Sequence, residues 1–277
     1  MIEGGLRTRG SIKRGDAATP LVSVITVVRN GMPLVERTID AILSQTYSNV
    51  EYIVVDGAST DGTVELLRRR DDEIDYWLSE PDAGLYDAMN KGIALVSDPS
   101  SYVLFANSDD RLYEPETIEK MITAGKGADF IYGKQVLTDG ETAAVLGSEI
   151  DLSGLARRNI SHAATLVRRG VFDTVGKFDL RYKLVADYDF FVRCFQSPVE
   201  SRFVDQVVSE VSMFGLSETQ FRVLLRERLD VIAARFKGVA RLTATAQIYC
   251  YDIPRNVLRG ELRKRGLLSR WRAIKGM

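Results

Sequence analysis

The sequence predicts an α/β fold, built on a mostly parallel sheet that helices flank on both faces. Short apolar runs typical of strands alternate with segments of helical periodicity through the first half of the chain. Polar clusters follow several of these runs directly, at the carboxyl ends where such sheets bind ligands. Apolar residues make up 45% and charged residues 27% of the 277 residues, which argues against wholesale disorder and against a membrane-embedded chain.

The first two units each combine a strand with a helix. Val22 to Val28 is a β-branched run and is predicted as the first strand. Pro33 suits the first turn of the helix that follows. A second strand at Tyr52 to Val55 leads through a turn rich in capping residues into a helix at Val64 to Arg70.

The third unit places a strand near Tyr76 to Leu78 before a helix from about Leu85 to Val96. The fourth strand, Tyr102 to Ala106, is apolar on both faces, as expected for the middle of a covered sheet. The pattern then becomes mixed. We expect strands near 130–133, 143–146, 165–168 and 202–211, and a helix from about Tyr188 to Gln196.

Three segments are expected along the chain. Residues 1 to 19 are predicted to be a disordered leader, because Gly, Ser, Thr and Arg dominate and no apolar periodicity is present. Residues 20 to 216 form the main domain. Residues 217 to 277 are predicted to be a helical, basic C-terminal extension, because their apolar positions recur at helical spacing.

The basic stretch from Arg255 to Lys275 is interleaved with Leu, Trp and Ile. Such a helix can lie on an anionic membrane surface, or it can pack on the domain with its charges in solvent. Nucleic-acid binding is not expected, since the basic residues are confined to one tail. Two cysteines without metal-like or redox-like spacing fit a reducing cytoplasm, with any membrane contact peripheral and on the inner face.

Asn107-Ser108-Asp109-Asp110 closes the fourth strand and is the most informative cluster. Adjacent carboxylates repel one another unless a cation or hydrogen bonds offset their charge. Oxygen ligands favour a hard divalent ion, so we expect Mg²⁺ or Mn²⁺ here. Phosphates of the substrate would supply its remaining ligands. The alternative is a solvated Asx turn.

Several of these motifs together resemble a known family, the inverting nucleotide-sugar glycosyltransferases of family 2 with the GT-A fold. The resemblance covers roughly Leu21 to Ser217. Its markers are the segments 24–30, 44–47, 54–63, 84–92, 107–110 and 186–189.

For the nucleotide, the resemblance implies that Thr26 and Asn30 line the pocket and that Asp56 contacts the base. Ser59 and Asp61 would support the same loop.

For the rest of the donor, the resemblance implies a contact from Asp87. Asn107, Ser108 and Asp109 occupy the family's Asp-any-Asp motif at the ribose and metal. The first position is Asn here and carries no charge, which makes Asp109, with Asp110 beside it, the expected metal ligand.

On the acceptor side, Asp187 matches the family's catalytic base, which removes the proton of the incoming hydroxyl. Asp189 is the second candidate, since either residue could instead cap the helix. His162, the only histidine, matches a position where the family often has His, and either an acceptor-side or a structural role is open. Residues 213 to 217 resemble the family's loop over the active site, with one glycine in place of the usual pair.

The leading hypothesis is an inverting transferase that moves a sugar from a nucleotide-diphosphate sugar to a hydroxyl of a lipid-linked saccharide, a glycolipid or a polysaccharide precursor. A dinucleotide-binding oxidoreductase is an alternative, because Asp56 follows a second strand, but Asn30-Gly31-Met32-Pro33 contains no Gly-any-Gly phosphate cradle. A non-catalytic scaffold that binds nucleotide sugars would explain the fold, and the retained carboxylates argue against it.

Overall fold

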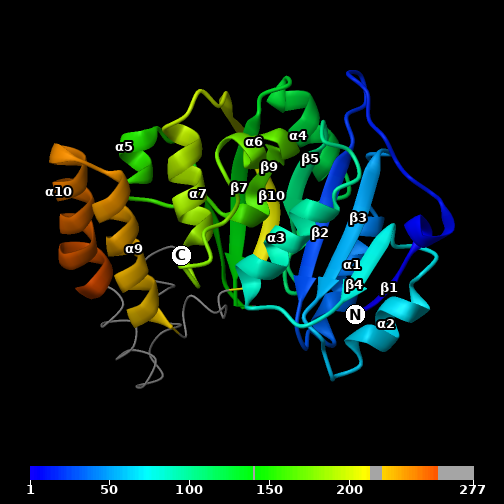
Figure 1. The fold of residues 1–277 in the computed structure, drawn as a ribbon. Helices are drawn as coiled ribbons and strands as arrows, with labels where there is room; N and C mark the ends of the chain where they lie inside the picture. The colour runs from blue at the N-terminus through cyan, green and yellow to red at the C-terminus, as the bar shows by residue number, and fades with distance from the viewer. Residues whose placement is uncertain (140, 213–219, 255–277) are drawn as a thin grey trace.

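A computed structural model describes residues 1–139, 141–212 and 220–254. In this part of the chain, ten strands form one sheet with helices on both faces (Figure 1). The strand order is β1-β4-β3-β2-β5-β9-β7-β10-β6, and β8 pairs with β7 beside this path. The predicted α/β class is therefore confirmed.

The half of the sheet nearer the N-terminus contains the predicted parallel strands. They are β2 (Val22–Val28), β3 (Val50–Asp56), β4 (Tyr76–Ser79) and β5 (Tyr102–Phe105). Val28 pairs with Asp56, and Asp56 pairs with Ser79, so three of these strands end level with one another. This alignment brings the loops after the strands to one edge of the sheet.

The other half is mixed. It consists of β6 (Arg111–Leu112), β7 (Phe130–Thr138), β8 (Ala143–Leu146), β9 (Thr165–Arg168) and β10 (Ser201–Ser212). β9 runs antiparallel between β5 and β7, whereas β10 is parallel to β7 and antiparallel to β6.

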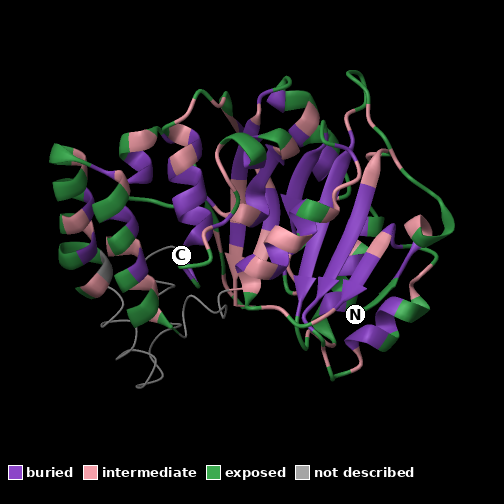
Figure 2. Ribbon diagram, viewed as in Figure 1, coloured by how far each residue is buried: buried purple, intermediate pink, exposed green. Residues whose placement is uncertain are grey.

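Two hydrophobic cores cover the two faces of the sheet, which is buried along most of its length (Figure 2). Alternation along β2 decides the face: Ile25 and Val27 belong to one core, and Val24 and Val28 to the other. The first core is covered by α3 (Leu85–Leu95), α5 (Leu152–Leu155), α6 (Arg169–Thr174), α7 (Ala186–Phe195) and α9 (Phe221–Arg235). The second is covered by α1 (Leu34–Leu43), α2 (Thr63–Arg69) and α4 (Thr117–Gly125).

The N-terminal segment differs from the prediction of a disordered leader over residues 1 to 19. β1 (Ile2–Gly4) pairs antiparallel with β4 at the sheet edge, and the short helix η1 (Leu6–Arg9) follows it. Lys13 Nζ lies 2.9 Å from the buried Asp75 carboxylate. Backbone hydrogen bonds to β4 and ion pairs hold this segment in place. Neither kind of interaction requires apolar residues at regular spacing, so an ordered segment was not expected here.

The C-terminal extension is helical as far as the structure describes it. α9 is followed by α10 (Gly238–Gln247) and a π-helical turn, Ile248–Asp252. The loop expected at 213 to 217 and the basic stretch from Arg255 to Lys275 lie outside the described residues. No described helix has both the length and the apolar character needed to cross a bilayer.

Candidate active site

Asp56 ends β3 at the aligned edge of the sheet and is fully buried. Its Oδ2 accepts hydrogen bonds from Ser79 Oγ at 2.6 Å and from the Ser59 amide at 3.0 Å. Its Oδ1 is buried and has no hydrogen-bond partner in the described residues. An unpaired buried acceptor is costly, so a ligand that donates an N–H to Oδ1 would be stabilised here.

The loops that follow β2 and β3 are tied together by Asn30, Ser59 and Asp61. Ser59 Oγ accepts from the Asn30 amide at 2.7 Å, and Asp61 Oδ2 accepts from the Met32 amide at 2.8 Å. Burial opposes ionisation of Asp61, but hydrogen bonds from Thr63 and Met32 outweigh it and lower the pKa of Asp61. These hydrogen bonds hold the loop that contacts Asp56 in place.

Thr26 lies two residues before the end of β2 and is fully buried. Its Oγ1 accepts a hydrogen bond from the Tyr52 hydroxyl at 3.0 Å, within the core under α1 and α2. The structure therefore does not bring the Thr26 side chain to the cluster at the sheet edge.

Asp87 lies in the first turn of α3 and braces the preceding loop. Its Oδ2 accepts from the Ala83 amide at 2.9 Å and lies 3.7 Å from Lys91 Nζ. That loop lies so close to Gly57 that a Cβ there would require the Asp82 carboxylate to move. Asp87 thus lies at the edge of the sheet where the other site residues gather, but it contacts the loop before α3 and not Asp56.

The two carboxylates of the Asn107–Asp110 turn point in different directions. Asp110 is 3% exposed and its Oδ2 accepts from the Asn107 amide at 2.9 Å, so it closes the turn. Burial, with Asp109 adding to it, raises the pKa of Asp110 to about 6, against the opposing influence of His162 and the Asn107 amide. Asp109 is exposed and makes no hydrogen bond or ion pair within the described residues.

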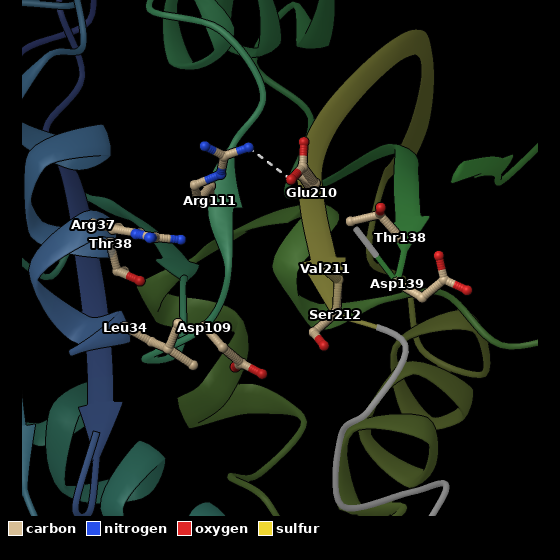
Figure 3. A pocket seen from close by; sticks show the side chains of 10 residues that line it. All are labelled: Leu34, Arg37, Thr38, Asp109, Arg111, Thr138, Asp139, Glu210, Val211 and Ser212. Atoms are coloured by element: carbon tan, nitrogen blue, oxygen red, sulfur yellow. Dashed lines mark hydrogen bonds and ion pairs between the residues drawn. The ribbon is translucent and has the colours of Figure 1, made fainter. Parts of the chain in front are cut away.

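Asp109 borders a polar cavity of about 300 Å³ between α1 and the ends of β7 and β10 (Figure 3). Charged side chains from several elements surround it, including Arg37 and the ion pair between Arg111 and Glu210, which are 2.6 Å apart. Mg²⁺ and Mn²⁺ are commonly bound by one or two carboxylates together with substrate phosphates. Asp109 fits this role, whereas Asp110 is turned inward.

Asp187 lies in the first turn of α7 and is 6% exposed. Its Oδ1 accepts from the Tyr86 hydroxyl at 2.9 Å and from the Tyr188 amide at 2.8 Å, and its Oδ2 lies 3.1 Å from His162 Nδ1. Burial and the charge of Asp187 raise the pKa of Tyr86 well above its usual value, so the hydroxyl keeps its proton and donates. Three groups therefore fix the orientation of this carboxylate.

His162 connects Asp187 to the Asn107 turn, because its Nε2 lies 2.8 Å from Asn107 Nδ2. Burial alone would lower the pKa of His162, but the hydrogen bond and charge of Asp187, with Asp110 and Asp109, outweigh it and raise that pKa. Sequence reasoning had not assigned Tyr86 any role. A polar hydroxyl among buried positions of α3 was its only signal.

Asp189 is fully buried, but the structure does not bring it to this group. Its two oxygens each lie 2.8 Å from an arginine Nε, one from Arg193 and one from Arg235 of α9. Both acceptor oxygens are thus engaged, and the arrangement favours a structural role for the second candidate base.

The start of α7 is also held by α9 through the buried Glu227. The Glu227 carboxylate accepts from the amides of Lys183 and Leu184 at 2.9 to 3.0 Å, immediately before the helix begins. A C-terminal helix therefore fixes the segment that presents Asp187.

Known proteins with similar sequences are glycosyltransferases. The family model "Glycosyl transferase family 2" matches residues 23–175. A "PGL/p-HBAD biosynthesis glycosyltransferase" of Mycobacterium bovis is 35% identical over 211 residues, which cover 73% of this chain and 81% of that protein. An "uncharacterized glycosyltransferase" of Mycobacterium tuberculosis is 30% identical over 194 residues, 64% of this chain and 69% of the relative.

Solved structures share the fold at low sequence identity. TarS of S. aureus, in complex with UDP-GlcNAc, gives a TM-score of 0.64 at 15% identity and covers 83% of this chain and 73% of that one. The mannosyltransferase PcManGT of Pyrobaculum calidifontis, in complex with GDP-Man and Mn²⁺, gives 0.61 at 16% identity and covers 98% and 88%. The sequence match and the shared fold lead to one conclusion. This chain belongs to glycosyl transferase family 2 and is a glycosyltransferase with the GT-A fold.

Proposed function

We propose that the protein is an inverting transferase that moves a sugar from a nucleotide-diphosphate sugar to an acceptor hydroxyl. The acceptor oxygen forms a bond to the anomeric carbon from the face opposite the diphosphate. The bond from that carbon to the phosphate oxygen breaks, and the nucleoside diphosphate leaves. Asp187 takes the proton of the acceptor hydroxyl.

The observation that carries this proposal is the environment of Asp187. Its carboxylate is buried at the start of α7, Tyr86 and His162 hold it, and no arginine or lysine neutralises it among the described residues. Asp189, two residues later, is paired with two arginines. Asp187 is therefore not locked between permanently charged guanidinium groups, which makes it the better candidate for the base.

On the donor side, the partnerless Oδ1 of Asp56 suits an N–H of a nucleotide base. Asp109 would hold the divalent ion together with the diphosphate, where the ion supplies charge compensation for the leaving group. The relatives in solved structures bind UDP-GlcNAc in one case and GDP-Man with Mn²⁺ in another, which supports a nucleotide-sugar donor and a divalent ion.

We propose a lipid-linked saccharide, a glycolipid or a polysaccharide precursor as the acceptor. The name of the mycobacterial relatives, which refers to PGL/p-HBAD biosynthesis, supports the glycolipid member of this group. The basic stretch from Arg255 to Lys275 would bring the enzyme to an anionic membrane on the cytoplasmic side.

The first experiment is donor hydrolysis. The purified protein is incubated with uridine-, guanosine- and thymidine-diphosphate sugars in the presence of Mn²⁺, Mg²⁺ or a chelator, and the released nucleoside diphosphate is quantified. We expect metal-dependent release from one donor and its loss in Asp109→Ala. Donor binding without hydrolysis or transfer, across many acceptors, would favour a non-catalytic scaffold.

Once a donor and an acceptor are known, the transfer reaction tests the base and the stereochemistry. Asp187→Asn should lower kcat by about 10²- to 10⁴-fold, the usual contribution of a general base. Asp173→Asn, an exposed carboxylate on α6, serves as the matched control. Retention of the anomeric configuration in the product would rule out the single displacement.

A further inference from the structure

Asn107 and His162 form a hydrogen-bonded chain between the donor-side turn and Asp187. Asn107 Nδ2 lies 2.8 Å from His162 Nε2, and His162 Nδ1 lies 3.1 Å from Asp187 Oδ2. These contacts join the end of β5 to the start of α7 through the short helix η2 (His162–Ala164). Each contact lies within hydrogen-bonding distance.

The amide group of Asn107 determines the direction of donation in these two hydrogen bonds. An amide NH₂ only donates, so Nε2 of a neutral His162 must accept from it. The ring proton then lies on Nδ1 and is donated to the Asp187 carboxylate, which only accepts. A carboxylate at position 107 could not donate to Nε2. The ring would then have to carry a proton on Nε2 and donate it to that carboxylate, either in place of the proton on Nδ1 or in addition to it.

From this geometry we propose that Asn107 and His162 are positioning residues that fix the orientation of Asp187 by setting the tautomer of the imidazole. The inference rests on the proposed role of Asp187 as the base. It gives a function to asparagine at the first position of the turn, because the amide supplies the donor that a carboxylate lacks.

The same amide keeps a second group for the donor substrate. Asn107 Oδ1 is buried and has no hydrogen-bond partner within the described residues. A hydroxyl of the donor can donate to Oδ1 while Nδ2 stays bonded to His162. The asparagine therefore contacts the donor with one atom and holds the base with the other.

The tautomer can be read directly, because His162 is the only histidine of the chain. We would record two-bond ¹H–¹⁵N correlations of the ring in ¹⁵N-labelled protein without a histidine tag, at alkaline pH. The expected pattern is that of a ring protonated on Nδ1 only. In Asn107→Ala the pattern should change to a mixture of the two tautomers. A ring of the unaltered protein protonated on Nε2, or averaging between tautomers, would overturn the proposal.

Kinetics of a matched pair of variants test the positioning role. The amide nitrogen of Asn can take the place of Nδ1, whereas that of Gln takes the place of Nε2. His162→Asn should therefore retain donation to Asp187, and His162→Gln should lose it. We expect kcat to fall about 10- to 100-fold in His162→Gln, as for other residues that orient a reacting group, with the donor KM little changed and a clearly smaller fall in kcat in His162→Asn. Equal losses in the two variants would contradict positioning through Nδ1.

The two proposals can fail separately. If Asp187→Asn keeps its activity, Asp187 is not the base, whatever the tautomer of His162. If Asp187→Asn is inactive while the spectrum shows Nε2 protonated, Asp187 remains the base and the chain from Asn107 is refuted. Far-ultraviolet circular dichroism of each variant verifies that it is folded.

Discussion

Two buried aspartates on one turn of α7 have opposite surroundings. Asp187 receives hydrogen bonds from Tyr86, the Tyr188 amide and His162, whereas Asp189 contacts the guanidinium groups of Arg193 and Arg235. Each oxygen of Asp189 is occupied by a charged hydrogen bond, so neither is left to contact an acceptor hydroxyl. The surroundings, rather than the residue type, separate a reactive group from a structural one.

Asp189→Asn should destabilise the protein without altering the reaction. Removal of one partner from a buried ion pair costs about 3 to 5 kcal/mol, and here two arginines lose their counterion. Urea unfolding should show a lower midpoint than for the unaltered protein. Folded Asp189→Asn should keep most of its kcat, and a loss as large as that of Asp187→Asn would contradict the structural assignment.

Asp56→Ala should weaken nucleotide binding. Its partnerless Oδ1 is the atom proposed to accept from the base, and a hydrogen bond to a charged group contributes about 1.5 to 3 kcal/mol. Titration calorimetry with the nucleoside diphosphate of the identified donor would measure a rise in Kd of roughly 10- to 100-fold. Asp72→Asn, a highly exposed carboxylate on another loop, is the control, and equal affinities in both variants would exclude this role for Asp56.

The residue types of the site were readable from the sequence, but their partners were not. The motifs placed Asp56, Asp109 and Asp187 at strand ends and a helix start, where the structure has them. The contact between Tyr86 and Asp187 joins positions 101 residues apart, and no local pattern encodes such a contact. Thr26 fits the motif and faces the same side of the sheet as Asp56, but it pairs with Val54, two residues before Asp56, and its hydroxyl is bonded to Tyr52 inside the core.

At the scale of elements, the N-terminal segment adds a strand to an otherwise exposed sheet edge. β1 pairs with β4, and the segment that follows places Arg7 and Lys13 beside the buried Glu51 and Asp75. A covered edge is less prone to pair with other chains. The segment therefore contributes to the sheet although its composition is that of a loop.

Lys13→Met tests this contribution. Asp75 is almost fully buried and would retain only the Tyr52 amide, at 2.8 Å, as the donor to its Oδ2. The loss should be about 1 kcal/mol, at the lower end of the range for a buried group that loses a partner, because Lys13 is partly exposed. Urea unfolding measures it, with Lys177→Met at an exposed position as the control. Unchanged stability would mean that the ion pair contributes nothing.

Most of the predicted strands and helices are present in the structure, including the short strands β8 and β9. β2, β5 and α3 lie within a residue or two of their expected ranges. β1 and β6 were not expected, since strands of two or three residues at a sheet edge carry no pattern. The helices η2, α4, α5 and α6 were not predicted either.

At the scale of the whole molecule, the C-terminal extension is part of the active-site framework. Glu227 of α9 accepts from the amides of Lys183 and Leu184, and Arg235 of the same helix contacts Asp189. The middle and the C-terminal end of this helix thus contact the segment that carries Asp187. The division into a main domain and an extension, expected at residues 216 and 217, does not separate two independent functions.

Glu227→Ala should reduce kcat more than it reduces donor affinity. Without the carboxylate, the loop before α7 loses three hydrogen bonds and Asp187 is less well placed, and small misplacements can cost about 10²-fold in rate. Steady-state kinetics would separate the two parameters. Asp230→Asn, exposed on the same helix, is the matched control, and a rise in donor KM with constant kcat would refute the positioning role.

The attachment of α7 to a helix so late in the chain has a consequence for synthesis. Strands β2 to β5, with Asp56 and the Asn107 turn, are complete while residues after 110 are still being translated. Glu227 and Arg235 leave the ribosome long afterwards, and a tertiary contact between distant segments cannot form before both exist. A nascent chain therefore gains a correctly held base only after residue 235 has been made, well after the residues of the nucleotide edge.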